Sequence, residues 1–329
     1  MKHLIYLLML SLLLNACSSL PKQRIINNPV QEQALQLSEK ASQFEKIKAW
    51  DKALTYYQYA LEKYRLTDDV QGVLATQISI ARQYKQMNQK SDYDNICQKI
   101  ESTLSISTGK NDLANEFTLL KIEYLYQLSE YDSLLSVFQS IQEENQEHSL
   151  RKHSWEYLSL FETNKNFKSK TEALESEADK ALKAYKKKQF ENISAISFAY
   201  YTLGYVAYHQ RNASQTDYQK SIRYFQKAYE ADVIDQNFHN LATDLYYFAS
   251  AYQKMNDHKN AAWYFERAGH VYKQCNDQEK SDFAFFFAYK NQYLQQKRDE
   301  DLQIINQLLK KTENTELVRL IEEWLKTIK

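Results

Sequence analysis

The sequence predicts an all-α repeat protein, and three observations support this prediction. The first is the scarcity of turn-forming residues, since the 329 residues include only 4 Gly and 2 Pro, against roughly 12% of residues in average usage. Sheet proteins place Gly and Pro in hairpins and tight turns, so a sandwich, a barrel or a doubly wound sheet is not expected. The second is a hydrophobic content of 43%, enough to build a core. The third is a pattern of small and aromatic residues that recurs about every 40 residues.

The N-terminal segment has the features of an export signal. Lys2 is followed by an apolar stretch over residues 4–14, which is long enough for the core of a signal peptide and too short to cross a bilayer. The stretch ends in Leu14-Asn15-Ala16-Cys17, which resembles a bacterial lipobox. The resemblance implies cleavage before Cys17 and covalent lipid on its sulfur. With Ser18 in the next position, it also implies export to the periplasmic face of the outer membrane.

We therefore expect a signal peptide over 1–16, a lipidated tether over 17–32 and a repeat domain over 33–329. An ordinary cleaved signal followed by an incidental cysteine is the alternative. No later stretch approaches the roughly 20 apolar residues of a membrane-spanning helix. The lipid is thus the only membrane attachment that the sequence predicts.

The repeat pattern is clearest in three segments with small, aromatic and small residues at positions i, i+4 and i+7, which share one face of a helix. The segments are Ala53/Tyr57/Ala60, Ser221/Phe225/Ala228 and Ala261/Phe265/Ala268. Each follows a predicted helix that carries its own small residue, namely Ala41, Gly204 and Ala249. In chain order, the centres of the second helices of the units are expected near residues 53, 96, 134, 178, 221, 261 and 301.

This pattern resembles the tetratricopeptide repeat (TPR), in which a helix A packs against a helix B. The pair Leu203-Gly204 matches the Leu-Gly pair of the family's helix A. The resemblance implies a right-handed superhelical solenoid of about seven helix-turn-helix repeats, with a period near 40 residues instead of the common 34. The charged, Leu- and Ile-containing end from Leu302 to Lys329 is expected to cap it. A generic helical bundle is the alternative.

The sequence offers no motif for catalysis or for a metal ion. His148 and His153 are five residues apart, and neither H-E-x-x-H nor C-x-x-C occurs. No two glycines are close enough for a phosphate-binding loop. We therefore expect neither an enzyme nor a cofactor other than the lipid on Cys17.

The charge balance bears on the partner, and the positions of the cysteines bear on disulfide bonds. Acidic and basic residues balance at 42 each, which argues against nucleic acid, because phosphate binding needs a basic face. Cys97 and Cys275 lie more than four repeats apart in a fold whose repeats contact mainly their neighbours. A disulfide between them is not expected, and Cys97 is expected in the core.

The TPR resemblance places the binding surface in a concave groove lined by the A helices. In that family, positions 2, 5, 9 and 12 of helix A face the groove. The matching residues in two successive units are Phe198, Tyr201, Tyr205, Tyr208, Tyr246, Ser250 and Gln253. Tyrosine offers a large contact area and a polar tip, which suits peptide binding. The alternative for any one of these tyrosines is a role in core packing.

A further family feature is not evident. The family's carboxylate clamp uses Lys and Asn, whereas Tyr246 and Ser250 occupy the matching positions here. Binding of a chaperone tail by that clamp is therefore not expected.

Together these features predict a non-catalytic scaffold at the outer membrane that binds protein or peptide partners in cell-envelope assembly. One alternative is a peptide-sensing regulatory protein, because repeats of about 40 residues also resemble those of peptide-sensing bacterial regulators. Another is an accessory subunit of an envelope enzyme. The sequence does not determine the oligomeric state.

Overall fold

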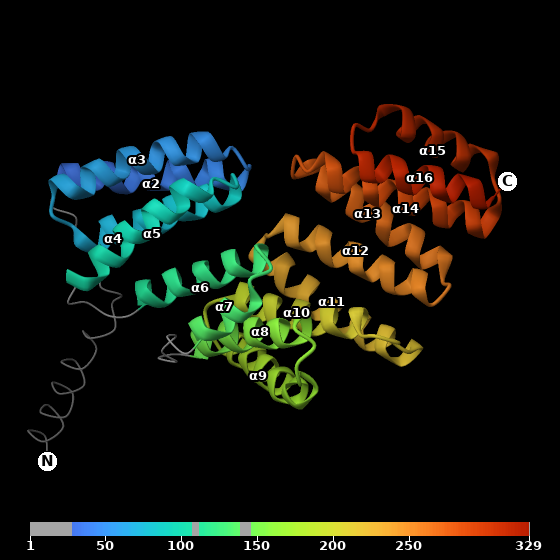
Figure 1. Cartoon of the computed structure of the whole chain (residues 1–329), viewed down its shortest axis with the longest axis horizontal. Coiled ribbons are helices and arrows are strands. Elements are labelled where there is room, and N and C mark those ends of the chain that lie inside the picture. The colour runs from blue at the N-terminus through green and yellow to red at the C-terminus, as the bar shows by residue number, and fades with distance from the viewer. Residues whose placement is uncertain (1–27, 107–111, 139–145, 329) are drawn as a thin grey trace, which may run out of the picture. The chain divides into compact units, whose positions relative to one another are not determined.

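The computed structural model describes residues 28–106, 112–138 and 146–328, and all the regular secondary structure in these ranges is helical (Figure 1). The chain divides into two compact units, residues 1–107 and residues 108–329. Cys17 and the rest of the expected signal peptide lie outside the described residues. Among the described helices, none combines the length and the apolar character needed to span a membrane.

The first unit consists of four helices, each packed against the next. They are α2 (Pro29–Lys46), α3 (Trp50–Leu66), α4 (Val70–Gln86) and α5 (Lys90–Ile106). Helix α2 begins at Pro29, earlier than the expected start of the repeat domain at residue 33. The reason is local, because the Asn28 side chain accepts a hydrogen bond from the Val30 N–H at 2.9 Å and proline suits the first turn of a helix.

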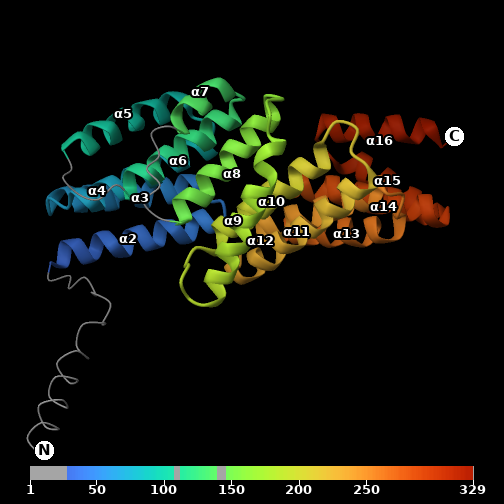
Figure 2. The ribbon, with the colours of Figure 1, turned by 90° about the horizontal axis from the view of Figure 1, so that it is seen from below.

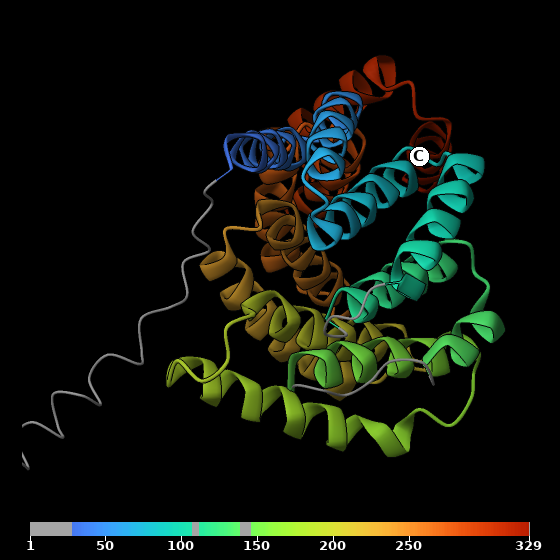
Figure 3. The same ribbon diagram turned by 90° about the vertical axis from the view of Figure 1, so that its left-hand side faces the viewer.

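The second unit continues the series of paired helices. Its helices are α6 (Asp112–Gln127), α7 (Tyr131–Val137), α8 (Gln146–Glu162), α9 (Lys168–Lys186), α10 (Ile193–His209), α11 (Gln215–Asp235), α12 (Phe238–Lys254), α13 (His258–Gln274), α14 (Gln278–Gln296), α15 (Asp299–Lys311) and α16 (Thr315–Thr327). Figure 2 shows α11, α12, α13 and α14 side by side, each in contact with the next. Helix α10 also packs on α8, α9 and α12 (Figure 3), so A helices contact A helices of neighbouring pairs.

The predicted order of helix pairs is confirmed. Each expected centre of a second helix falls within the B helix of a pair, in the order α3, α5, α7, α9, α11, α13 and α15, although at residues 53, 261 and 301 it lies in the first turn of the helix and not at its centre. Helix α16 follows the seventh pair. Its Leu317, Ile321 and Trp324 are buried against Phe286 of α14 and Ile305 of α15, so the C-terminal segment covers the last pair as expected.

The small–aromatic pattern produces the packing that it predicts. The aromatic residues Phe225 and Phe265 are almost fully buried, as are the small residues on either side of them. A Cβ atom at Gly204 would lie 3.0 Å from the Phe225 ring, closer than nearly all Cβ contacts. The glycine on helix α10 therefore makes room for the ring on helix α11, and a larger residue would push the pair apart.

The turns between helices show how the chain folds with so few glycines. Eleven described residues have a positive φ angle, and none of them is glycine. They are Lys48, Asp68, Asn88, Ser129, Asn164, Lys188, Asn212, Gln236, Asn256, Asn276 and Lys297. Asparagine recurs because it tolerates the left-handed conformation better than most residues.

The turn at Asn256 shows the arrangement. After this left-handed residue, the Asp257 N–H donates to the Tyr252 carbonyl at 2.9 Å and closes helix α12. The Asp257 side chain then accepts from the Asn260 N–H at 3.1 Å and caps helix α13. One short turn thus satisfies the ends of two helices.

Candidate functional site

The residues predicted to line a groove lie on the A helices α10 and α12, and Phe161 of α8 lies beside them. We define the aromatic face as Phe161, Phe198, Tyr201, Tyr205, Tyr208, Tyr246 and Tyr247. All seven are partly exposed. The aromatic face is therefore a surface of partly buried rings in contact with one another, and not part of the hydrophobic core.

Tyr247, which the sequence analysis missed, is central to this face. Its ring centroid lies 5.8 Å from those of Tyr201, Tyr205 and Tyr208. It also stacks on the buried Phe225 ring, with a centroid distance of 5.0 Å. Tyr247 thus connects the tyrosines of α10 to α12 and to the helix beneath, although the family's groove positions do not include it.

Hydrogen bonds hold the tyrosine hydroxyl groups in an uncharged network. Tyr201 is hydrogen-bonded to Tyr247, and burial raises the pKa of both. Tyr208 is hydrogen-bonded to Ser250, and burial raises the pKa of Tyr208 to about 12. All these hydroxyls are protonated at neutral pH, so the aromatic face offers rings and neutral polar groups.

The other predicted residues lie in different surroundings. Phe198 packs on Trp155 of α8, with 4.6 Å between the ring centroids. Tyr246 packs edge-on against Phe265, with 5.1 Å between the ring centroids. Ser250 is only 7% exposed, and its hydroxyl donates to the Tyr246 carbonyl. Ser250 was expected to line an open groove. Its short side chain is instead buried, and it contacts Tyr208 and Tyr246 from the inner side of the aromatic face. Gln253 is half-buried near the end of α12.

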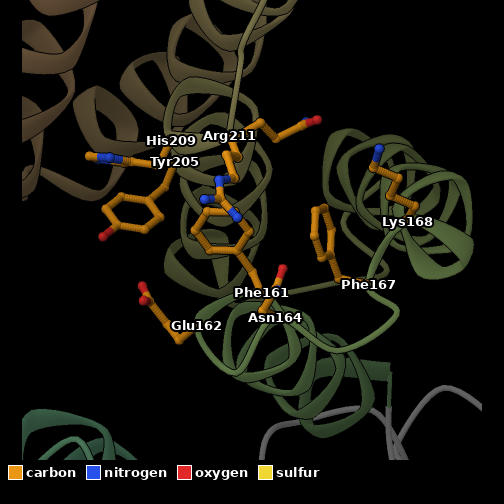
Figure 4. Close-up of a pocket in the computed structure, with 9 residues that line it drawn as sticks. Phe161, Glu162, Asn164, Phe167, Lys168, Tyr205, His209 and Arg211 are labelled. Atoms are coloured by element: carbon orange, nitrogen blue, oxygen red, sulfur yellow. The ribbon is translucent and has the colours of Figure 1, made fainter.

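An open pocket of about 470 Å³ adjoins the aromatic face (Figure 4). It forms where helix α8 ends, helix α9 begins and helix α10 ends. It is lined by Phe161, Glu162, Asn164, Phe167, Lys168, Tyr205, His209, Gln210 and Arg211. Tyr205 is the one residue of this lining that the sequence analysis had selected.

Aromatic rings form the apolar walls of the pocket. The Phe161 ring meets the Phe167 ring edge-on at 5.2 Å and the Tyr205 ring edge-on at 6.3 Å. The His209 ring lies 4.3 Å from Tyr205, and burial together with the charge of Lys254 lowers the pKa of His209. The imidazole is therefore mostly neutral at pH 7.

The charged groups of the pocket differ in their hydrogen bonds and salt bridges. Glu162 accepts a hydrogen bond from the Tyr126 hydroxyl at 3.0 Å and is also hydrogen-bonded to Tyr205. Lys168 and Arg211 are exposed, and neither forms a salt bridge with another residue of the described chain. The pocket thus combines apolar walls with the cations Lys168 and Arg211 and the carboxylate of Glu162, and Lys168 also interacts electrostatically with Asp217.

A pair of buried carboxyl groups lies between helices α11 and α12. Asp232 and Asp244 are each about 1% exposed, and they are hydrogen-bonded to each other. Burial raises the pKa of both, and Ser197 of α10 is hydrogen-bonded to Asp232. A pair so deeply buried is a structural feature and not an accessible acid–base site.

Within the described ranges, no three His, Cys, Asp or Glu side chains come together in a way that could hold a metal ion. The groups that the described site presents are aromatic rings, hydroxyls and charged side chains.

Comparison with known proteins gives one informative result. No family model matches the sequence, and no curated protein matches it. Among solved structures, the crystal structure of the apo form of RapI matches with a TM-score of 0.58 over 89% of this chain and 80% of RapI. The chain has a TPR-like helical repeat fold. At 13% identity, this similarity concerns the fold alone.

Proposed function

We propose that this chain is a non-catalytic peptide-binding protein whose aromatic face and adjoining pocket hold the peptide. The observation that supports this most directly is the continuity of the two, since Tyr205 belongs to the aromatic face and also lines the pocket. An extended ligand on the face would reach the pocket without a break. Rigid tyrosines with few rotatable bonds lose little entropy when they bind such a ligand.

Of the roles that the sequence left open, we favour peptide sensing over an envelope-assembly scaffold. The paired helices repeat about every 40 residues, which is the feature by which the sequence resembles peptide-sensing regulators. The helical-repeat fold shared with RapI extends over most of both chains. The binding event, and not a chemical reaction, would then carry the signal.

A peptide library tests the proposed function. We expect residues 28–329 to enrich a subset of a random heptapeptide library, and Tyr205→Ala to abolish that enrichment. Tyr59→Ala is the matched control, because Tyr59 is 57% exposed on helix α3 and outside the aromatic face. Circular dichroism would verify that both variants fold. An unselective library, or enrichment that survives Tyr205→Ala, would reject the proposal.

We further propose that the chain acts outside the cytoplasm, held at the periplasmic face of the outer membrane by lipid on Cys17. The support is the lipobox-like sequence that ends at that residue. Two or more acyl chains anchor a protein stably, whereas one binds only marginally. Labelling with a palmitate analogue should mark the full chain and not its Cys17→Ala variant, and equal labelling of both would refute the anchor.

A further inference from the structure

We propose, on the basis of the peptide-binding function above, that the pocket takes the C-terminal residue of the peptide. That residue would place an aromatic or large apolar side chain between the rings and pair its free carboxylate with Arg211. The ligand class is thus a peptide with a hydrophobic last residue and an unmodified C-terminus.

Aromatic walls form the apolar half of the pocket. Phe161 is met edge-on by both Phe167 and Tyr205, at 5.2 Å and 6.3 Å. A ring inserted beside them gains further edge-to-face contacts, which aromatic pairs prefer. A volume of about 470 Å³ accommodates one large side chain with its backbone.

The charged half of the pocket comes from Arg211, which is exposed and forms no salt bridge within the described chain. Glu162 accepts hydrogen bonds from two tyrosine hydroxyls and, within the described chain, forms no salt bridge with Arg211 or Lys168. In Figure 4 the Arg211 guanidinium extends among the labelled side chains, while Lys168 lies to the side of Phe167. A planar guanidinium can hold a carboxylate through two hydrogen bonds, and such charge-assisted pairs are the stronger ones.

The combination points to a chain end instead of an internal residue. The walls select an apolar side chain and the cations select a carboxylate, and a hydrophobic C-terminal residue carries both groups on a single Cα atom. The pocket lies beside the turns that follow α8 and α10, and Phe161 and Tyr205 belong both to its lining and to the aromatic face. A peptide lying along the face would therefore reach the pocket with one of its ends.

Three fluorinated probes test this inference by fluorine NMR titration of residues 28–329. The first is an acetylated tetra-alanine peptide that ends in para-fluorophenylalanine with a free carboxylate. The second is its C-terminal amide, and the third is para-fluorophenylpropionate without a peptide. We expect the acid to bind about tenfold more tightly than the amide, since one charge-assisted hydrogen-bonded pair is lost. The propionate should bind more weakly than the peptide acid.

Two arginine variants complete the test. Arg211→Gln should remove the preference for the acid, whereas Arg223→Gln, at an exposed arginine of α11 outside the pocket, should retain it. Equal binding of acid and amide that is lost in Tyr205→Ala would overturn the C-terminal inference and leave peptide binding intact. Propionate binding as tight as that of the peptide acid would overturn the peptide as the source of the carboxylate. Absence of binding by both peptides would also overturn the inference, while the library experiment judges the proposed function separately.

Discussion

At the scale of single residues, the buried pair Asp232–Asp244 has the clearest energetic consequence. In an unfolded chain both carboxyl groups have a pKa of about 3.9. In the folded chain burial raises both pKa values, and the proximity of Asp232 raises that of Asp244 further. Above pH 4 the folded state therefore holds more protons than the unfolded state. The free energy of unfolding consequently falls as pH rises through the raised pKa values.

Asp244→Asn should stabilise the protein at pH 7 by at least about 1 kcal/mol, because one unit of pKa shift corresponds to about 1.4 kcal/mol. Asparagine keeps the shape and a hydrogen-bond donor but carries no charge. Urea unfolding at pH 5 and pH 7.5 measures the effect, and the loss of stability between the two pH values should shrink in the variant. Glu230→Gln, at an exposed position of helix α11, is the control and should behave like the unaltered protein. A variant as pH-sensitive as that protein would contradict the assignment.

At the scale of helices and turns, left-handed residues take the place of glycine throughout the described chain. A non-glycine residue in this conformation costs roughly 1–2 kcal/mol, and asparagine less than others. The chain thus holds its helix pairs together despite strained turns, and the strain differs from one turn to the next. Gln236, with φ of 57° after helix α11, is a strained example.

Gln236→Gly should raise the free energy of unfolding by about 0.5–1 kcal/mol, after allowance for the greater freedom of glycine in the unfolded chain. The same change at Asn256, whose φ is 61°, should give little or no gain, because asparagine is already tolerated there. Denaturant midpoints of the two variants provide the comparison. An equal gain at both sites would show that turn strain is not the cause.

The helix pairs themselves depend on small residues at their contacts. Ala261 on helix α13 is fully buried beside Ala249 and Phe265. Ala261→Leu should therefore lower stability by about 1–3 kcal/mol, since three added carbon atoms overpack the contact. Lys259→Leu adds a leucine at an exposed site of the same helix and should change the melting temperature little. An unchanged melting curve for Ala261→Leu would refute this placement of the repeat.

At the scale of the whole molecule, the repeat could be predicted from the sequence and the pocket could not. The phase of the pairs follows from a local pattern, because Ser221, Phe225 and Ala228 share one helix face and meet the preceding helix. The pocket instead joins Phe161, Lys168 and Arg211 from the ends of three helices. No spacing along the chain marks such a meeting of turns. Tyr247 was missed for a related reason, since its neighbours lie on another helix.

The division into two units leads to a prediction about where function resides. The second unit buries its own clusters, including Tyr200 and Ile196 on α10 and Phe286 on α14. The lining of the pocket comes entirely from α8, α9, α10 and the turns beside them. Residues 112–329 alone should therefore fold into a helical protein that unfolds cooperatively, because each helix pair retains the neighbours that cover it.

This fragment should also bind the fluorinated peptide acid with an affinity within about twofold of that of residues 28–329, a difference below about 0.5 kcal/mol. Circular dichroism and the same fluorine titration measure the two properties on one preparation. Arg211→Gln in the fragment supplies the control, because it should weaken binding without changing the helical signal. A helical fragment that fails to bind would mean that recognition needs residues before 112. An unfolded fragment would mean that the second unit depends on the first for its stability.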